Sequence, residues 1–139
     1  MGSRPNVLLI EGDAAQEALA RKAITNSEID CDVRVARDGV EACDMLFDSA
    51  SPAPNLVLLA LAIPKINGFE VLTRIRHCEE TSRLPVVIFS SSEKQADIDK
   101  CFDLHANSYV QKVKDPEIYE TRLKLALYYW IAVNTNGNA

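Results

Sequence analysis

The fold is decided by the stretch from residue 55 to residue 72, with the sequence NLVLLALAIPKINGFEVL. Its run 56–59 is apolar on both faces, a pattern typical of a central strand in a parallel sheet. Residues 64–68 include proline, asparagine and glycine and predict a turn. From 69 to 76 apolar side chains recur every three to four residues, which predicts a helix with one buried face. The stretch therefore predicts a buried strand joined to a helix by a short turn.

The same alternation of strand and helix continues in both directions along the chain. The predicted strands span 7–10, 31–36, 56–59, 85–89 and 108–111. The predicted helices span 14–24, 40–47, 69–76, 93–104 and a last segment that begins at Pro116. Asp13 is expected to cap the first helix, and Ser90–Ser92 the helix that starts at Glu93. Five such units with short connections predict an α/β domain, in which helices cover both faces of a parallel sheet.

The composition fits one globular domain. The chain has 139 residues, of which 47% are hydrophobic and 25% charged, so we expect a single domain over 1–139 with its core at about 6–133. The tail 134–139 is expected to be disordered. A net charge of −5 argues against binding nucleic acid or an anionic membrane surface, since both favour a basic face.

The lack of a signal peptide or membrane span and the spacing of the cysteines both favour the cytoplasm. No apolar run approaches the roughly 20 residues that span a bilayer, and residues 1–6 lack the apolar segment of a signal peptide. The four cysteines are far apart and match no zinc-site spacing, so we expect reduced and mostly buried thiols in a cytoplasmic protein. They are Cys31, Cys43, Cys78 and Cys101.

Polar and small residues follow the predicted strands, at the sheet edge where ligands bind in open parallel sheets. Around them, five segments in the expected order resemble the receiver domain of two-component response regulators. The segments are 7–11, 55–59, 63–72, 84–90 and 106–112. The resemblance covers nearly the whole chain. It implies a flavodoxin-like (βα)5 fold, with a five-stranded parallel sheet in the order 2-1-3-4-5.

A further segment resembles a narrower group of regulators. Residues 103–109, a Lys112 not followed by proline, and a long last helix bearing Tyr and Trp resemble the small response regulators paired with cyanobacterial and bacterial phytochromes. This resemblance implies a histidine kinase, a phytochrome, as partner. It also implies a single receiver domain without a DNA-binding module.

The family's chemistry implies a role for each strand-end residue. In the family, an aspartate after the third strand accepts phosphate from a histidine kinase, and an acidic pair after the first strand holds Mg²⁺. A serine or threonine and a lysine contact the phosphoryl oxygens, and an aromatic residue acts as a switch. Such a set neutralises the charge that develops in phosphoryl transfer. The matching positions are Ala60 for the acceptor, Glu11 and Gly12 for the acidic pair, Ser90 and Lys112 for the phosphate pocket, and Tyr109 for the switch.

The sequence departs from the family at the acceptor and metal positions. Ala60 offers a methyl group, which cannot be phosphorylated. Gly12 removes one carboxylate of the acidic pair, Asp13 holds the next position, and Ala62 leaves only its backbone carbonyl as a metal ligand. Mg²⁺ prefers octahedral oxygen ligands that include one or two carboxylates. Glu11 alone therefore predicts weak Mg²⁺ binding at most, and we expect no cofactor.

Two questions stay open at these positions. Ala60 is either natural, which the joint loss of a carboxylate at Gly12 favours, or a replacement for a native aspartate. Glu11 is either a weak cation ligand or the partner of the Lys112 ammonium, which takes a counter-charge readily when buried. The pattern favours a structural role for Lys112 over a catalytic one.

The remaining candidates have simpler interpretations. Without a phosphate, Ser90 is expected to act as a helix cap or backbone partner, and Tyr109 as a half-buried packing residue instead of a switch. Asp13 is expected to be a cap, with a cation ligand as the alternative. No carboxylate–His–Ser or Cys–His spacing surrounds His77 or His105, so we expect both to be ordinary helix-surface or helix-end residues. An enzyme built on the serine and lysine of the phosphate pocket is a further alternative, but we expect no enzymatic activity.

The last helix is apolar on more than one face. A core-facing stripe is formed by Tyr119, Leu123, Ala126, Leu127 and Trp130. Further apolar side chains lie off that stripe: Leu125, Tyr128, Tyr129 and Ala132. Because tyrosine and tryptophan are enriched in interface hot spots, we predict that this outer face forms a homodimer interface. A bulky core helix is the alternative.

The predicted function is that of a stand-alone receiver domain in a two-component phosphorelay. It docks a phytochrome-type histidine kinase and dimerises, while Ala60 blocks phosphorylation at the usual site. The alternative is a phosphoryl-accepting regulator whose acceptor aspartate was replaced by alanine.

Overall fold

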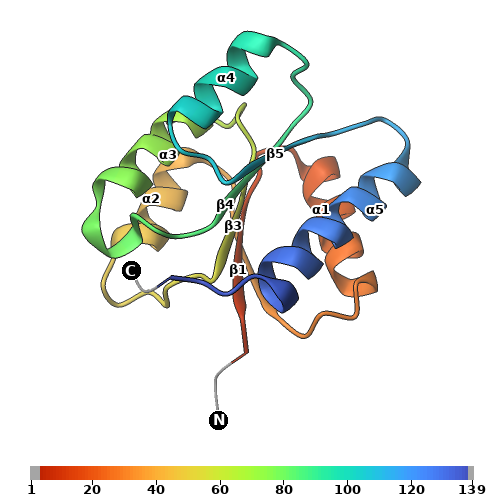
Figure 1. The fold of residues 1–139 in the computed structure, drawn as a ribbon, viewed down its shortest axis with the longest axis horizontal. Coiled ribbons are helices and arrows are strands. Elements are labelled where there is room, and N and C mark those ends of the chain that lie inside the picture. Colours follow the sequence, from red (N-terminus) through yellow and green to blue (C-terminus); the bar gives the residue numbers. More distant parts are fainter. Residues whose placement is uncertain (1–3, 138–139) are drawn as a thin grey trace.

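The computed structural model describes residues 4–137 and contains the five predicted strand–helix units (Figure 1). The strands are β1 Asn6–Ile10, β2 Asp32–Ala36, β3 Leu56–Leu59, β4 Val86–Ser90 and β5 Ser108–Gln111. The helices are α1 Ala14–Asn26, α2 Gly39–Phe47, α3 Gly68–His77, α4 Gln95–Asp103 and α5 Pro116–Leu127. Two short segments were not predicted: the 3-10 helix η1 Glu79–Thr81 and the π-helix η2 Tyr128–Val133, which continues α5.

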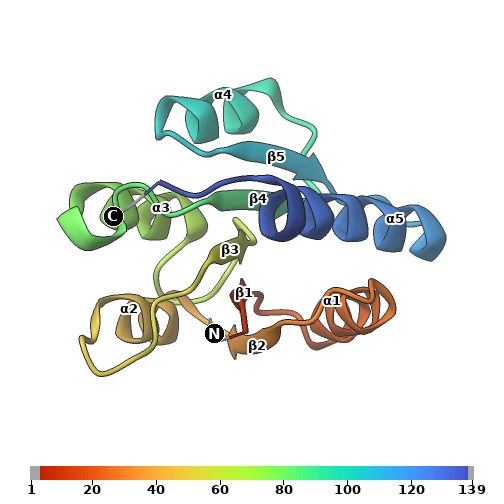
Figure 2. The same cartoon turned by 60° about the horizontal axis from the view of Figure 1, so that its bottom comes forward.

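The strands form one parallel sheet in the order β2-β1-β3-β4-β5, which confirms the predicted order. Helices α1 and α5 pack together on one face, and α2, α3 and α4 cover the other (Figure 1). Figure 2 shows α4 beside the edge strand β5. Within residues 4–137, no helix combines the length and the apolar character that a membrane span requires.

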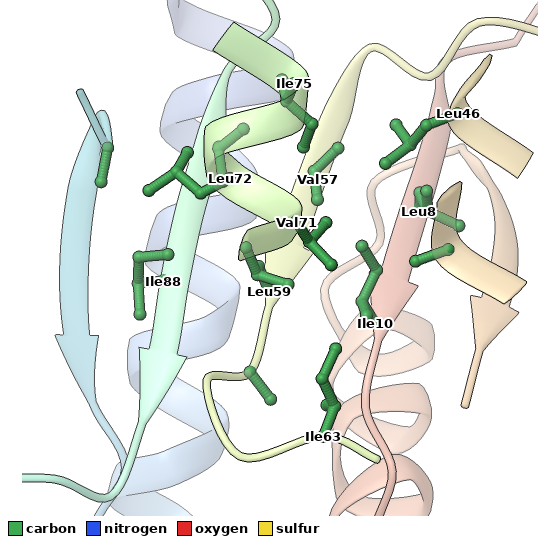
Figure 3. Packing of buried hydrophobic residues seen from close by; sticks show 14 of the residues in the cluster. Leu8, Ile10, Leu46, Val57, Leu59, Ile63, Val71, Leu72, Ile75 and Ile88 are labelled. Carbon is green, nitrogen blue, oxygen red and sulfur yellow. The ribbon is translucent and has the colours of Figure 1, made fainter. Parts of the chain in front are cut away.

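Alternate residues of the central strands supply two separate cores. Leu8 and Ile10 of β1 lie in the cluster that includes Leu72 of α3 (Figure 3). Val7 and Leu9 lie in the second cluster, which packs against α1 and α5. Both faces of β1 are therefore buried, which explains why the central strands are apolar runs without alternation.

The predicted cap of α1 is confirmed, and the predicted cap of α4 is wrong. The Asp13 side chain accepts the N–H groups of Ala15 and Gln16, so the predicted cap of α1 is confirmed. The prediction that Ser90–Ser92 caps a helix from Glu93 is wrong. Helix α4 begins at Gln95, and no side chain caps it. Ser90 Oγ accepts the N–H of Ser92, while the Ser92 hydroxyl accepts the N–H of Lys94 and donates to Asp97 Oδ2 in the first turn of α4. Neither hydroxyl accepts an N–H group of that first turn, so neither caps the helix.

The thiols are less buried than expected, and the tail prediction is untested. Of the four free cysteines, only Cys101 is fully buried; the other three are half-buried. Residues 134–137 follow η2 without helix or strand, and Asn136 Nδ2 donates to the carbonyl of Asn55 at 3.4 Å. Disorder of the tail stays a prediction, and its last two residues lie outside the described part of the chain.

Arg76 joins three segments that sequence reasoning did not connect. Its guanidinium donates to the carbonyls of Leu84 at 2.7 Å, His105 at 2.9 Å and Ser82 at 3.3 Å, and to Asn107 Oδ1 at 2.8 Å. All of these acceptors are uncharged, and burial lowers the pKa of Arg76. This arginine ties the end of α3 to the loops that precede β4 and β5.

Candidate functional site

A cavity of about 340 Å³ lies at the carboxyl ends of β1, β3, β4 and β5. It brings together most of the predicted phosphate and metal residues: Glu11, Asp13, Ala60, Ala62, Ser90 and Lys112. Gly12 and Tyr109 do not line it. The parallel topology explains this convergence, because the ends of neighbouring parallel strands meet at one edge of the sheet.

The centre of the cavity is an ion pair between Lys112 and Glu11. Lys112 Nζ lies 2.5 Å from Glu11 Oε1, and the two side chains are only 12% and 6% exposed. The second carboxylate oxygen of Glu11 accepts the backbone N–H of Asp13 at 3.3 Å. Of the two alternatives open for Glu11, the structure has the ion pair. Two buried charges are thereby neutralised by one another and by a backbone donor.

The floor of the cavity carries no nucleophile at the acceptor position. Ala60 is buried, and its N–H donates to the carbonyl of Ile10 at 3.0 Å, which holds the end of β3 against β1. The start of α3 packs closely on the same residue: a Cβ on Gly68 would lie 2.5 Å from the Ala60 carbonyl oxygen. A glycine is required at that point because no side chain fits between α3 and the end of β3.

The donor set does not fit a Mg²⁺ ion. Glu11 is bound to Lys112, and one oxygen of the Asp13 carboxylate, Oδ1, accepts the N–H groups at the start of α1. At Gly12 an added Cβ would lie 2.8 Å from Pro64 Cδ and 3.2 Å from the Arg37 carbonyl oxygen, so a side chain there requires the loop to move. Over residues 4–137, no three His, Cys, Asp or Glu side chains are grouped to hold a metal. Magnesium favours six oxygen ligands in octahedral geometry, and this arrangement does not supply them.

The remaining predicted residues are held by hydrogen bonds within the loop after β4. Ser90 Oγ accepts the N–H of Ser92 at 3.1 Å, in agreement with its interpretation as a backbone partner. Tyr109 is half-buried, packs against the core, and donates its hydroxyl to the Ser92 carbonyl at 2.8 Å. The two histidines lie away from the cavity: His77 Nδ1 bonds to the Thr73 carbonyl, and His105 occupies the turn after α4.

Sequence reasoning missed several residues of the cavity. Gln16, Ser91 and Lys114 also line it, and Gln16 Oε1 is buried without a hydrogen-bond partner among the described residues. Tyr119 of α5, which was predicted to face the core, does not line the cavity; it is buried, and its pKa is raised by burial and further by the Glu11 carboxylate. The signal for Ser91 and Lys114 was their position just beyond the ends of β4 and β5. Gln16 gave no comparable signal, because it lies inside a helix.

The outer face of α5 and η2 is a separate apolar surface. Leu125, Tyr128, Tyr129 and Ala132 are all exposed. Trp130 is half-buried between this surface and the core, and its ring meets that of Tyr129 edge to face with centroids 5.0 Å apart. We name these four exposed residues the α5 patch. Leu125 lies on α5, and the other three lie on η2, which continues it.

Comparison with known proteins gives a consistent result. Residues 7–124 match the family described as the response regulator receiver domain. The chain is 34% identical over 113 residues to response regulator Rcp1 of Synechocystis sp., an alignment that covers 78% of this chain and 77% of that protein. Among solved structures, the phosphorylated cyanobacterial phytochrome response regulator RcpA has a TM-score of 0.92 at 31% identity, over 98% of this chain and 100% of that one. The Mn²⁺-bound form of Rcp1 has a TM-score of 0.89 at 30% identity, over 96% and 99%.

Proposed function

The chain belongs to the response regulator receiver domain family, and from that premise we propose that it acts in two-component signalling without being phosphorylated at position 60. One observation carries the proposal: the cavity has Ala60 at the acceptor position and, in the same place, a buried ion pair between Lys112 and Glu11. A methyl group cannot accept a phosphoryl group. The lysine, which as a free cation would stabilise phosphoryl oxygens, is already bound to a carboxylate.

The signal is therefore carried by binding and not by phosphoryl chemistry. No step of the proposal uses a metal, because Glu11 is paired with Lys112 and Gly12 supplies no carboxylate. We assign no enzymatic reaction to the cavity. The alternative, a native aspartate replaced by Ala60, is less favoured because Gly12 has lost a second family carboxylate and packs closely on Pro64.

The proposed partner is a histidine kinase of the phytochrome class. The support is similarity: one solved structure with a TM-score of 0.92 is named as a cyanobacterial phytochrome response regulator. The proposed compartment is the cytoplasm, where four free thiols such as those of this chain stay reduced. Nucleic acid and membrane surfaces are not proposed as partners, because the net charge of −5 disfavours both.

We further propose that the chain forms a homodimer through the α5 patch. Its two tyrosines and one leucine are large, apolar and exposed, in a helix whose opposite face already packs on the sheet. Aromatic side chains with a polar tip tolerate solvent in the free chain and pack well when a partner covers them. A second copy presents the same surface, which suits a two-fold interface.

Incubation with Mg²⁺ and acetyl phosphate is expected to leave the intact mass of the chain unchanged. The Ala60→Asp variant is expected to form no more adduct than Ala60→Asn, which has the same size but no nucleophile, because Glu11 stays bound to Lys112 and position 12 lacks a carboxylate. Mass spectrometry of the intact chains makes the measurement. A stoichiometric, Mg²⁺-dependent adduct on Ala60→Asp would support a native aspartate. An adduct on the unaltered chain would point to Glu11, Asp13 or Ser90 and contradict the proposal.

Substitution of Tyr128 by glutamate is expected to convert a dimer to a monomer in sedimentation equilibrium. The charge would be buried without a partner in the interface, at a cost of several kcal/mol. Phe102→Glu is the control, since Phe102 of α4 is also an exposed aromatic residue, 48% exposed against 57% for Tyr128, and lies outside the patch. A monomeric unaltered chain at all concentrations, or equal dissociation in both variants, would contradict dimerisation through the α5 patch.

A further inference from the structure

Ser92, in the loop between β4 and α4, uses every polar group it has. Its N–H donates to Ser90 Oγ at 3.1 Å, and its hydroxyl donates to Asp97 Oδ2 at 2.6 Å. The same hydroxyl accepts the N–H of Lys94 at 3.2 Å. Its carbonyl accepts the Tyr109 hydroxyl at 2.8 Å. One serine therefore connects the end of β4, the first turn of α4 and the middle of β5.

These bonds hold the hydroxyls of Ser90 and Tyr109, the two positions that match the family's phosphate-contacting serine and its aromatic switch. Ser90 lines the cavity and Tyr109 lies outside it, yet both hydroxyls bond to the backbone of Ser92. Each of these bonds is made by groups of the chain itself. The arrangement needs no ligand in the cavity to hold the loop or the tyrosine ring in place.

The anchor of the arrangement is the bond to Asp97. A hydroxyl that donates to a carboxylate at 2.6 Å forms a charge-assisted hydrogen bond, which is stronger than a bond between neutral groups. Serine has one rotatable side-chain bond between its hydroxyl and its backbone. Fixing the hydroxyl on α4 therefore also restricts where the N–H and carbonyl of Ser92 can lie.

We infer that Ser92 is a positioning residue that locks the β4–α4 loop and Tyr109 in one arrangement in the unphosphorylated chain. Asp97 of α4 is the point to which it is locked. The inference rests on the proposed function, because a permanent lock has a use only where position 60 never receives a phosphoryl group. The surface formed by α4 and β5 is then presented to partners in a single state.

Fluorine NMR of chain labelled with 3-fluorotyrosine tests the lock directly. The four tyrosines give a small set of resonances, and the one that disappears in Tyr109→Phe identifies Tyr109. Ser92→Ala is expected to shift or broaden that resonance. It is also expected to speed hydrogen exchange of the amides at 91–94 by roughly tenfold or more, the change expected for losing one charge-assisted hydrogen bond.

Three variants make the result specific. Ser91→Ala is the matched control, an exposed neighbour in the same loop, and is expected to change neither readout. Ser92→Thr keeps the hydroxyl and is expected to restore both. Asp97→Ala leaves the loop sequence intact and is expected to reproduce Ser92→Ala, which keeps the test valid if the loop variant fails to fold. Equal behaviour of Ser92→Ala and Ser91→Ala would overturn the inference.

The inference and the proposed function fail separately. A phosphoryl adduct on the unaltered chain overturns the proposed function and does not depend on the tyrosine resonance. A Tyr109 resonance that is already averaged in the unaltered, unphosphorylated chain overturns the lock and does not depend on the mass measurement.

Discussion

Replacement of Lys112 by methionine is expected to lower the free energy of unfolding by about 3–5 kcal/mol, the cost of breaking a buried ion pair by removing one partner. The carboxylate of Glu11 would stay in the core with one backbone N–H as its remaining donor. Methionine keeps the approximate length and the apolar stem of the lysine, so the lost free energy of unfolding measures the effect of removing the charge. Urea unfolding followed by the fluorescence of Trp130 gives the measurement.

Two further variants separate the ion pair from general damage to the cavity. Glu11→Gln combined with Lys112→Met removes both charges and is expected to recover most of the lost stability, since no unpaired charge is left. Lys114→Met is the matched control at the exposed rim of the same cavity and is expected to change stability by less than about 0.5 kcal/mol. If Lys112→Met unfolds at the same urea concentration as Lys114→Met, the buried ion pair does not hold the site together.

Arg76→Met is expected to lower the free energy of unfolding by about 3 kcal/mol. The substitution removes the donors for three backbone carbonyls and for Asn107 Oδ1, and hydrogen bonds that involve a charged group contribute about 1.5–3 kcal/mol each. Part of the loss is recovered because water can reach the freed carbonyls. Because Asn107 Oδ1 also accepts the N–H of Val86, the start of β4 is expected to exchange its amides faster.

Arg74→Met is the matched control for this prediction. Arg74 lies on the same helix, is exposed, and pairs with Glu70 one turn away at 3.0 Å. An exposed ion pair of this kind contributes about 0.2–1 kcal/mol. Similar losses in the two variants, or faster exchange spread evenly over the sheet in Arg76→Met, would show that Arg76 does not act as a local tie.

The fold was predictable because its central strands carry a strong signal. The run from Leu56 to Leu59 is apolar on both faces, and the structure buries it between two helical layers. The location of the site was predictable for a related reason. In a parallel sheet the strand ends meet, so Glu11, Ala60 and Lys112 had to lie near one another whatever their contacts.

The contacts themselves were not predictable to the same degree. Glu11 and Lys112 are 101 positions apart, and no local pattern selects an ion pair over a cation ligand. Ser92 lies beside two other serines, and only the placement of Asp97 and Tyr109 distinguishes it. At the end of the π-helix, the N–H of Asn134 donates to the carbonyl of Tyr129, five residues earlier. No periodic pattern in the sequence distinguishes this hydrogen bonding from that of an α-helix.

The ion pair between Glu11 and Lys112 has one more consequence, for how such a regulator is reset. A bound metal can be chelated and a phosphoryl group hydrolysed, but the Lys112 ammonium is part of the chain and is removed by neither a chelator nor a phosphatase. Under the proposed function, in which position 60 is not phosphorylated, the output of this chain would follow its abundance. A cell could strengthen or silence the signal through synthesis and turnover, and the supply of phosphodonors would not enter the response.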